Sequence, residues 1–168
     1  MKKLLVIAIM AVTAVAANAQ KYALIDMEYI LKNIPAYERA NEQLAQVSKR
    51  WQAEVEALGT EASTMYKNYQ NEVVFLSQEQ KQAKQDAIMQ KEKEAADLKK
   101  KYFGPEGELF KKRESLMSPI QDEIYNAVKE VSALRGYQLV LDRASDNGII
   151  FASPKIDISN EVLSKLGY

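Results

Sequence analysis

Cysteine and histidine are both absent from the 168-residue sequence. Without cysteine no disulfide can stabilise the fold, so its stability must come from packing and assembly. Without either residue, Ser-His-Asp and Cys-His nucleophile systems are excluded, and so are the usual zinc sites. The sequence therefore argues against hydrolases of these two types and against a zinc centre.

Glycine and proline are also scarce, with six and four residues. The glycines form neither a G-x-x-x-x-G-K-[ST] phosphate loop nor a G-x-G-x-x-G dinucleotide motif. Carboxylates are plentiful, but close pairs such as Glu92 and Glu94, or Asp122 and Glu123, lie in charged helical runs typical of solvated helix faces. We therefore predict that the protein is not an enzyme and binds no cofactor or metal.

The first twenty residues, "MKKLLVIAIMAVTAVAANAQ", have the pattern of a secretory signal peptide. Lys2 and Lys3 precede an apolar run, which ends before the A-x-A site Ala17-Asn18-Ala19. This run is shorter than the roughly 20 residues that a membrane-spanning helix needs. We predict a signal peptide at residues 1–19, cleavage after Ala19 and export to the periplasm, with an uncleaved N-terminal anchor as the alternative.

Cleavage would leave 21 basic and 23 acidic residues, a net charge of −2. This is not the basic profile of a nucleic-acid-binding protein, so no nucleic-acid partner is expected.

The segment from about Tyr37 to Leu134 is rich in Ala, Glu, Gln, Lys and Leu, the composition of long helices. In its first half, apolar residues recur every 11 residues, a spacing that favours an amphipathic helix with a nearly straight stripe. The predicted stripe consists of Ala40, Leu44, Val47, Trp51, Val55, Leu58, Ala62, Tyr66, Tyr69 and Val73.

Ser77, followed by Glu79 and Gln80, looks like the N-cap of a second helix. We therefore predict a helical hairpin over residues 37–134, with its tip near residues 74–77. The returning arm is polar at first, but Ile120, Ile124 and Val128 begin a firm apolar stripe near its end.

The returning arm is interrupted by Gly104-Pro105-Glu106-Gly107, because a Gly-Pro pair removes an amide donor and disfavours helix before the proline. A hairpin tip at this position would give very unequal arms. We interpret Gly104, Pro105 and Gly107 as a hinge or bulge at residues 104–107 that lets the arm bend.

The ends of the mature chain, residues 20–36 and 135–168, predict a small β body. Its predicted strands are "KYALID", "GYQLVLD" and "GIIFAS", with a hairpin turn at Asp146-Asn147-Gly148 between the last two. Ser159 is expected to cap a short final helix. A body of about 50 residues is marginal alone, so we predict that copies associate. The predicted oligomerisation residues are Tyr22, Leu24, Leu139, Leu141 and Ile150. The predicted fold class is thus α+β and mostly α: a long antiparallel helical hairpin projecting from a β body.

The order and spacing of these parts resemble the Skp (OmpH-like) periplasmic chaperones. The segments that carry the resemblance are "YALIDMEYIL", "YQLVLD" and "DISNEVLSKL". It implies a homotrimer in which the strands build a central body and three hairpins surround a cavity. It also implies ATP-independent holding of unfolded outer-membrane proteins, the clients of such a chaperone.

Residues along the arms suit a holding function, because aromatic and methionine side chains make adaptable contacts. The predicted client-binding residues are Met65, Tyr66, Tyr69, Phe75, Met89, Tyr102, Phe103 and Phe110. The alternative for each is that it only packs the hairpin. Seven lysines between Lys81 and Lys101 form a basic patch that could steer acidic clients or anionic lipid heads, and the resemblance adds lipopolysaccharide as a candidate partner. The rival function is that of a tethering coiled-coil protein of the cell envelope.

Overall fold

The computed structural model describes residues 21–145 and 148–168. The predicted signal peptide and two turn residues, Asp146 and Asn147, lie outside the described residues. The chain forms two compact units: Pro35–Gln121, and the described residues up to Ile34 together with Asp122–Tyr168. The second boundary therefore lies inside a helix at residue 122, whereas the sequence pattern predicts it at residue 135. The mostly helical fold class with a small strand body is confirmed.

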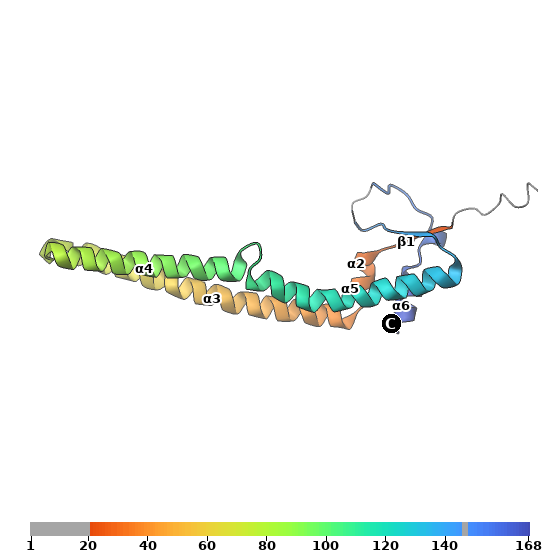
Figure 1. Cartoon of the computed structure of the whole chain (residues 1–168), viewed down its shortest axis with the longest axis horizontal. Helices are drawn as coiled ribbons and strands as arrows, with labels where there is room; N and C mark the ends of the chain where they lie inside the picture. The colour runs from red at the N-terminus through yellow and green to blue at the C-terminus, as the bar shows by residue number, and fades with distance from the viewer. Residues whose placement is uncertain (1–20, 146–147) are drawn as a thin grey trace, which may run out of the picture. The chain divides into compact units, whose positions relative to one another are not determined.

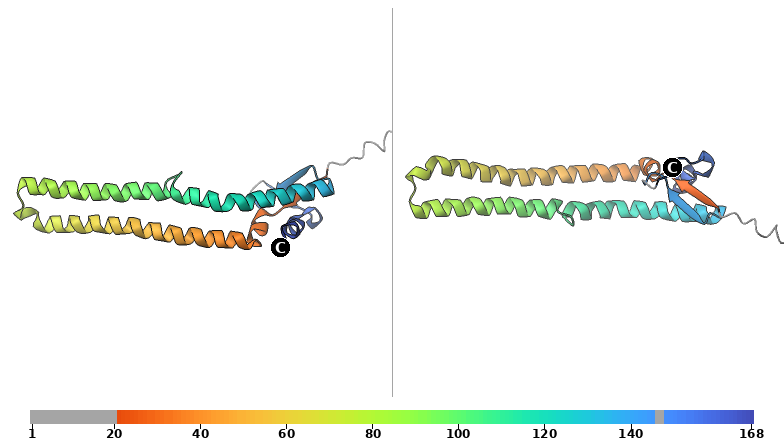
Figure 2. Two further views of the ribbon diagram at one scale, coloured as in Figure 1. Left: turned by 60° about the horizontal axis from the view of Figure 1, so that its bottom comes forward. Right: turned by 90° about the horizontal axis from the view of Figure 1, so that it is seen from above.

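The first unit contains a long helical hairpin. Helix α3 (Pro35–Glu72) and helix α4 (Gln78–Phe103) lie side by side and antiparallel, joined by the short 3-10 helix η1 (Val73–Phe75) (Figures 1 and 2). A capping box starts α4: the Gln80 amide donates to Ser77 Oγ at 3.2 Å, and the Ser77 amide donates to Gln80 Oε1 at 2.9 Å. These bonds satisfy amides that a helix start would otherwise leave unpaired.

The buried stripe of the first arm differs from the predicted 11-residue repeat at one position. Met65 is half-buried in the seam, whereas Tyr66 is 49% exposed. From Trp51 to Tyr69 the buried and half-buried positions alternate in steps of four and three residues. This heptad spacing is typical of a left-handed pair of helices, whereas an 11-residue spacing would give a nearly straight or slightly right-handed pair.

The facing seam of α4 is also heptad-spaced, but it is partly basic. Its buried and half-buried positions are Lys81, Lys84, Ile88, Lys91, Ala95, Leu98 and Tyr102. Lys84 pairs with Glu72, and Lys91 Nζ lies 3.4 Å from Glu61 Oε2. Ion pairs between the arms thus stand beside apolar contacts such as those of Ala62 and Ile88 in the outer half of the hairpin.

Helix α5 (Glu108–Arg135) follows α4 after a loop at residues 104–107, which stands out from the helices in Figure 1. Three backbone bonds shape this loop: Gly104 N–H to Lys100 O at 2.9 Å, Gly107 N–H to Gly104 O at 2.9 Å, and Lys111 N–H to Gly107 O at 3.1 Å. A Cβ added at Gly104 would lie 2.5 Å from Lys100 O, and one at Gly107 would lie 2.8 Å from Tyr102 O. Both glycines are therefore needed for close backbone packing.

The second unit contains a two-stranded parallel sheet. Strand β1 (Tyr22–Ile25) pairs with strand β2 (Leu139–Asp142) in the register Tyr22 to Leu139, and Leu24 forms an isolated bridge with Asp157. The predicted third strand is wrong: residues 148–153 carry no strand. Their β-branched residues favour strand, but a strand also needs a pairing partner: β1 is paired with β2 and Asp157, and residues 148–153 do not pair with the other edge of β2.

Three further short helices complete this unit: α2 (Met27–Lys32), the 3-10 helix η2 (Pro154–Ile156) and α6 (Ser159–Leu166). Its buried apolar core consists of Ala23, Leu24, Ile25, Ile30, Ile34, Ile124, Ala127, Val131, Ile158, Val162 and Leu163. The α6 N-cap is Ile158 rather than the predicted Ser159. The Ser159 hydroxyl instead accepts the Asp26 amide at 2.8 Å and donates to Asp157 Oδ1 at 2.6 Å.

An arginine links the segments around this core. The Arg143 guanidinium lies 3.1 Å from Asp26 Oδ2 and 3.4 Å from Asp157 Oδ2. Asp142, the last residue of β2, accepts the Met27 amide at 3.0 Å. These contacts hold together the residues that follow β1, the residues that follow β2, and the start of α6.

Candidate functional site

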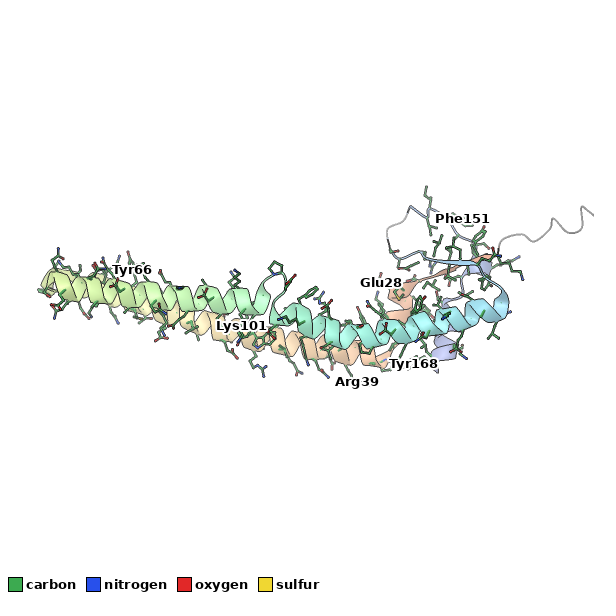
Figure 3. The ribbon with its side chains drawn as sticks, in the orientation of Figure 1. Glu28, Arg39, Tyr66, Lys101, Phe151 and Tyr168 are labelled. Carbon is green, nitrogen blue, oxygen red and sulfur yellow. The ribbon has the colours of Figure 1, made fainter. Side chains whose placement is uncertain are left out.

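The predicted client-binding residues divide into an exposed and a packed group. The exposed side chains, with their exposed fractions, are Tyr66 (49%), Phe75 (86%), Met89 (65%), Phe103 (36%) and Phe110 (45%). Figure 3 labels Tyr66 near the far end of the hairpin. Met65, Tyr69 and Tyr102 are half-buried in the seam between the arms. The exposed group is free to meet another molecule, while the packed group holds α3 and α4 together.

Tyr102 has the most contacts of the packed group. Its ring stacks on Trp51 with a centroid separation of 4.6 Å and an interplanar angle of 6°, and its hydroxyl donates to Glu54 Oε2 at 2.6 Å. Phe103 meets the Tyr102 ring edge to face at 6.3 Å. Such aromatic pairs add about 0.5–1.5 kcal/mol beyond the area they bury. The stack therefore fixes the end of α4 to α3 immediately before the 104–107 loop.

The Tyr102–Glu54 hydrogen bond predicts an alkaline transition. It raises the pKa of Tyr102 above its usual value, because ionisation would remove the proton donated to the carboxylate. Its stabilising effect is present at neutral pH and is lost as the pH rises through this raised pKa. We expect Trp51 emission to change in that range, with the midpoint lowered in Glu54→Gln and the transition absent in Tyr102→Phe. An unchanged midpoint in Glu54→Gln would contradict this assignment.

A shallow groove of about 290 Å³ lies between the arms next to this stack. Gln52, Val55 and Glu56 line it from α3, and Lys99 and Phe103 line it from α4. One wall is thus an exposed aromatic ring, and the others mix apolar, amide and charged groups. We call this the inner groove.

The opposite side of the hairpin is ionic. It carries Glu54, which binds Tyr102, and Glu61 and Glu94, which pair with Lys91 at 3.4 and 3.1 Å. These contacts raise the pKa of Lys91, chiefly through its hydrogen bond to Glu94, and lower the pKa of Glu94. The two sides of the hairpin therefore differ in chemistry.

The hairpin tip contains an apolar residue that the sequence analysis did not single out. Val74 is 76% exposed beside Phe75 in η1. A run of four apolar residues, "VVFL", at a predicted helix reversal was the available signal, since a reversal cannot bury all of them.

The predicted oligomerisation residues are mostly exposed in one chain. The exposed fractions are 55% for Tyr22, 53% for Leu139, 40% for Leu141 and 101% for Ile150. Phe151, labelled in Figure 3, is 84% exposed and extends this set. Leu24 is the exception, because it is only 4% exposed and packs in the core of its own chain. Leu24 therefore has almost no surface left for contact with another copy of the chain.

Among residues 21–145 and 148–168, no helix is long and apolar enough to cross a membrane. The same residues contain no group of three or more acidic side chains arranged to hold a metal ion.

Comparison with known proteins supplies the context for these surfaces. Residues 21–166 match the family described as Outer membrane protein (OmpH-like). The chain is 25% identical over 153 residues to the chaperone protein Skp of Yersinia enterocolitica, covering 90% of this chain and 88% of that protein. A crystal structure of an OmpH-like protein from Caulobacter crescentus has the same fold, with a TM-score of 0.70 at 14% identity. The match covers 86% of this chain and 82% of that one.

Proposed function

We propose, because the chain belongs to the OmpH-like outer membrane protein family, that it is a periplasmic holdase chaperone. It binds unfolded outer-membrane β-barrel proteins without ATP and keeps them from aggregating. The observation that carries the proposal is the row of exposed aromatic and methionine side chains along the hairpin, Tyr66, Phe75, Met89, Phe103 and Phe110.

Holding an unfolded chain needs many weak contacts that do not impose one register. Aromatic rings and methionine suit this need, because they offer large polarizable surfaces that tolerate different partners. Holding an unfolded chain in this way requires neither a nucleotide nor a metal. The basic patch between Lys81 and Lys101 adds attraction for acidic clients, and anionic lipid or lipopolysaccharide is a further candidate partner.

The proposed active form is a homotrimer. The second unit exposes apolar surface at Tyr22, Leu139, Leu141 and Ile150. An association between copies would remove this surface from water. Three hairpins would then enclose a shared cavity for the client. Export, with cleavage of the signal peptide after Ala19, would place this assembly in the periplasm.

An aggregation assay tests the proposed function. The mature protein should keep an outer-membrane β-barrel soluble when the barrel is diluted from urea, and neither ATP nor a metal chelator should alter this effect. Light scattering reports aggregation, and a helical protein of similar size and charge is the control. Aggregation at the rate of the control would overturn the proposal.

The competing proposal is a tethering protein whose hairpin spaces two partners in the envelope. A tether would bind folded partners at specific ends and would leave the aggregation of an unfolded barrel unchanged. The same assay therefore separates the two functions.

A further inference from the structure

The inner groove has a counterpart nearer the tip. The residues of the inner groove have counterparts fourteen positions away on each helix. On α3, Gln52, Val55 and Glu56 correspond to Tyr66, Tyr69 and Gln70. On α4, Lys99 and Phe103 correspond to Gln85 and Met89. Fourteen residues are two heptads, so each pair occupies the same face of its helix. Gln85 Nε2 donates to the Tyr69 hydroxyl at 3.0 Å, which places these two members of the second set together across the seam. By analogy with the inner groove, we call this set of five residues the outer groove.

The two grooves share the side of the hairpin that carries its exposed apolar residues. Apart from Val74 and Phe75 at the tip, Tyr66, Met89 and Phe103 are the large apolar side chains exposed between Trp51 and Phe103, and all three belong to the grooves. The outer groove set contains no charged residue, whereas Glu56 and Lys99 line the inner groove and Glu92 lies between the two sets on the same face of α4. This side therefore offers exposed apolar side chains beside a few charges, while Glu54, Glu61 and Glu94 on the opposite side are engaged in contacts with Tyr102 and Lys91.

The distance between the grooves corresponds to a short stretch of extended chain. Two heptads of α-helix rise about 21 Å. An extended polypeptide covers about 20 Å in six residues, and side chains six residues apart point to the same side of a strand. A transmembrane β-strand of about ten residues alternates apolar and polar side chains, so it contains such pairs.

We propose that the inner and outer grooves are paired subsites for one extended client segment with apolar side chains at positions i and i+6. The proposal rests on the proposed holdase function and specifies the pattern of apolar residues that the protein recognises in its client. Gln70 supplies an amide that can both donate to and accept from the unpaired backbone of such a segment. The side-chain oxygens of Gln52 and Gln85 can also accept from it, while their Nε2 atoms donate to Glu56 and Tyr69. Phe103 and Met89 contact the two apolar side chains.

Peptides test the spacing. Two labelled eleven-residue peptides of the same composition, built from Ser, Thr and Gln with two Leu, differ only in placing the leucines at i and i+6 or at i and i+5. Fluorescence anisotropy measures their binding to the complete mature protein. The i,i+6 peptide should bind about tenfold tighter, a difference of about 1.4 kcal/mol, because only its leucines face the same side. Equal binding, or no binding of either peptide, overturns the proposal.

Variants assign the preference to the grooves. Met89→Gln and Phe103→Gln should each bring the two peptides to nearly equal affinity, whereas Ala87→Gln, on the ionic side of α4, should keep the tenfold preference. A preference retained in both groove variants would also overturn the proposal, provided that circular dichroism shows their helices intact. The aggregation assay with a full barrel is run in parallel. A protein that holds the barrel but does not discriminate between the peptides keeps the proposed function and loses the paired subsites.

Discussion

Charging the exposed face of the sheet should dissociate the assembled protein and abolish its holding of unfolded barrels. The variant combines Leu139→Asp and Leu141→Asp, two positions on one face of β2 that are 53% and 40% exposed in the single chain. Full burial of a leucine contributes about 1.5–3 kcal/mol, and an unpaired carboxylate in its place would have to be desolvated. Native mass spectrometry should find three copies of the wild type and single copies of the variant.

The control adds the same two charges elsewhere. Gln121→Asp with Asn126→Asp changes two exposed positions of α5 and should leave the assembly at three copies. Circular dichroism checks that both variants keep their helices, because neither pair of positions lies in the buried core. A trimer that persists in the Leu139→Asp, Leu141→Asp variant would show that copies associate through another surface.

Local signals in the sequence were sufficient for the long helices and their ends. Ser77 and Gln80 specify the start of α4 through two bonds made within four residues. The break before α5 follows from Pro105 together with its flanking glycines, Gly104 and Gly107, since Pro119 alone leaves α5 continuous. Features of this kind depend on neighbours in the chain, so they can be read from the sequence without knowing the fold.

Features that depend on distant partners could not be predicted in the same way. Whether residues 148–153 form a strand depends on a pairing partner, and β-branched composition alone does not supply one. The sequence pattern predicts that Lys84 and Lys91 are solvated. In the structure they lie in the seam, because they pair with Glu72 and Glu61 on the other arm. Tyr66 and Met65 are adjacent apolar residues, and only the position of α4 decides which one is packed.

Deleting residues 104–107 should join α4 and α5 into one stiff helix and narrow the range of clients that the protein can hold. We propose that this loop is the hinge that lets the arm bend. The deletion removes one proline and two glycines, which cost about 3 and about 1 kcal/mol each in a helix interior. Four helical residues turn through about 400°, which is one full turn plus about 40°. Removing four residues should therefore rotate α5 about its axis by only about 40°, so that its packed face keeps nearly the same direction.

Alanine substitution is a poorer test of the hinge. A Cβ on Gly104 would lie 2.5 Å from Lys100 O, so the loop would have to re-form, and any new helical turns would lengthen the arm. The deletion instead removes the residues that stand out from the helices in Figure 1. The Trp51–Tyr102 stack precedes the deleted residues, so Trp51 emission should stay close to that of the wild type and report an intact hairpin.

The stability of the deletion variant does not decide the question, because the loss of any helix breaker raises the melting temperature. The deciding measurement compares a small and a large unfolded β-barrel in the aggregation assay. A hinge adapts the space between the arms to the client, so the stiffened protein should hold the small barrel almost as well as the wild type and the large one several-fold less. Both barrels would be held equally well by the wild type and the variant if the loop only adjusts the length of the returning arm to that of α3. In that case bending of the arm has no part in client binding, and Gly104 and Gly107 serve only to pack the loop against the last turn of α4.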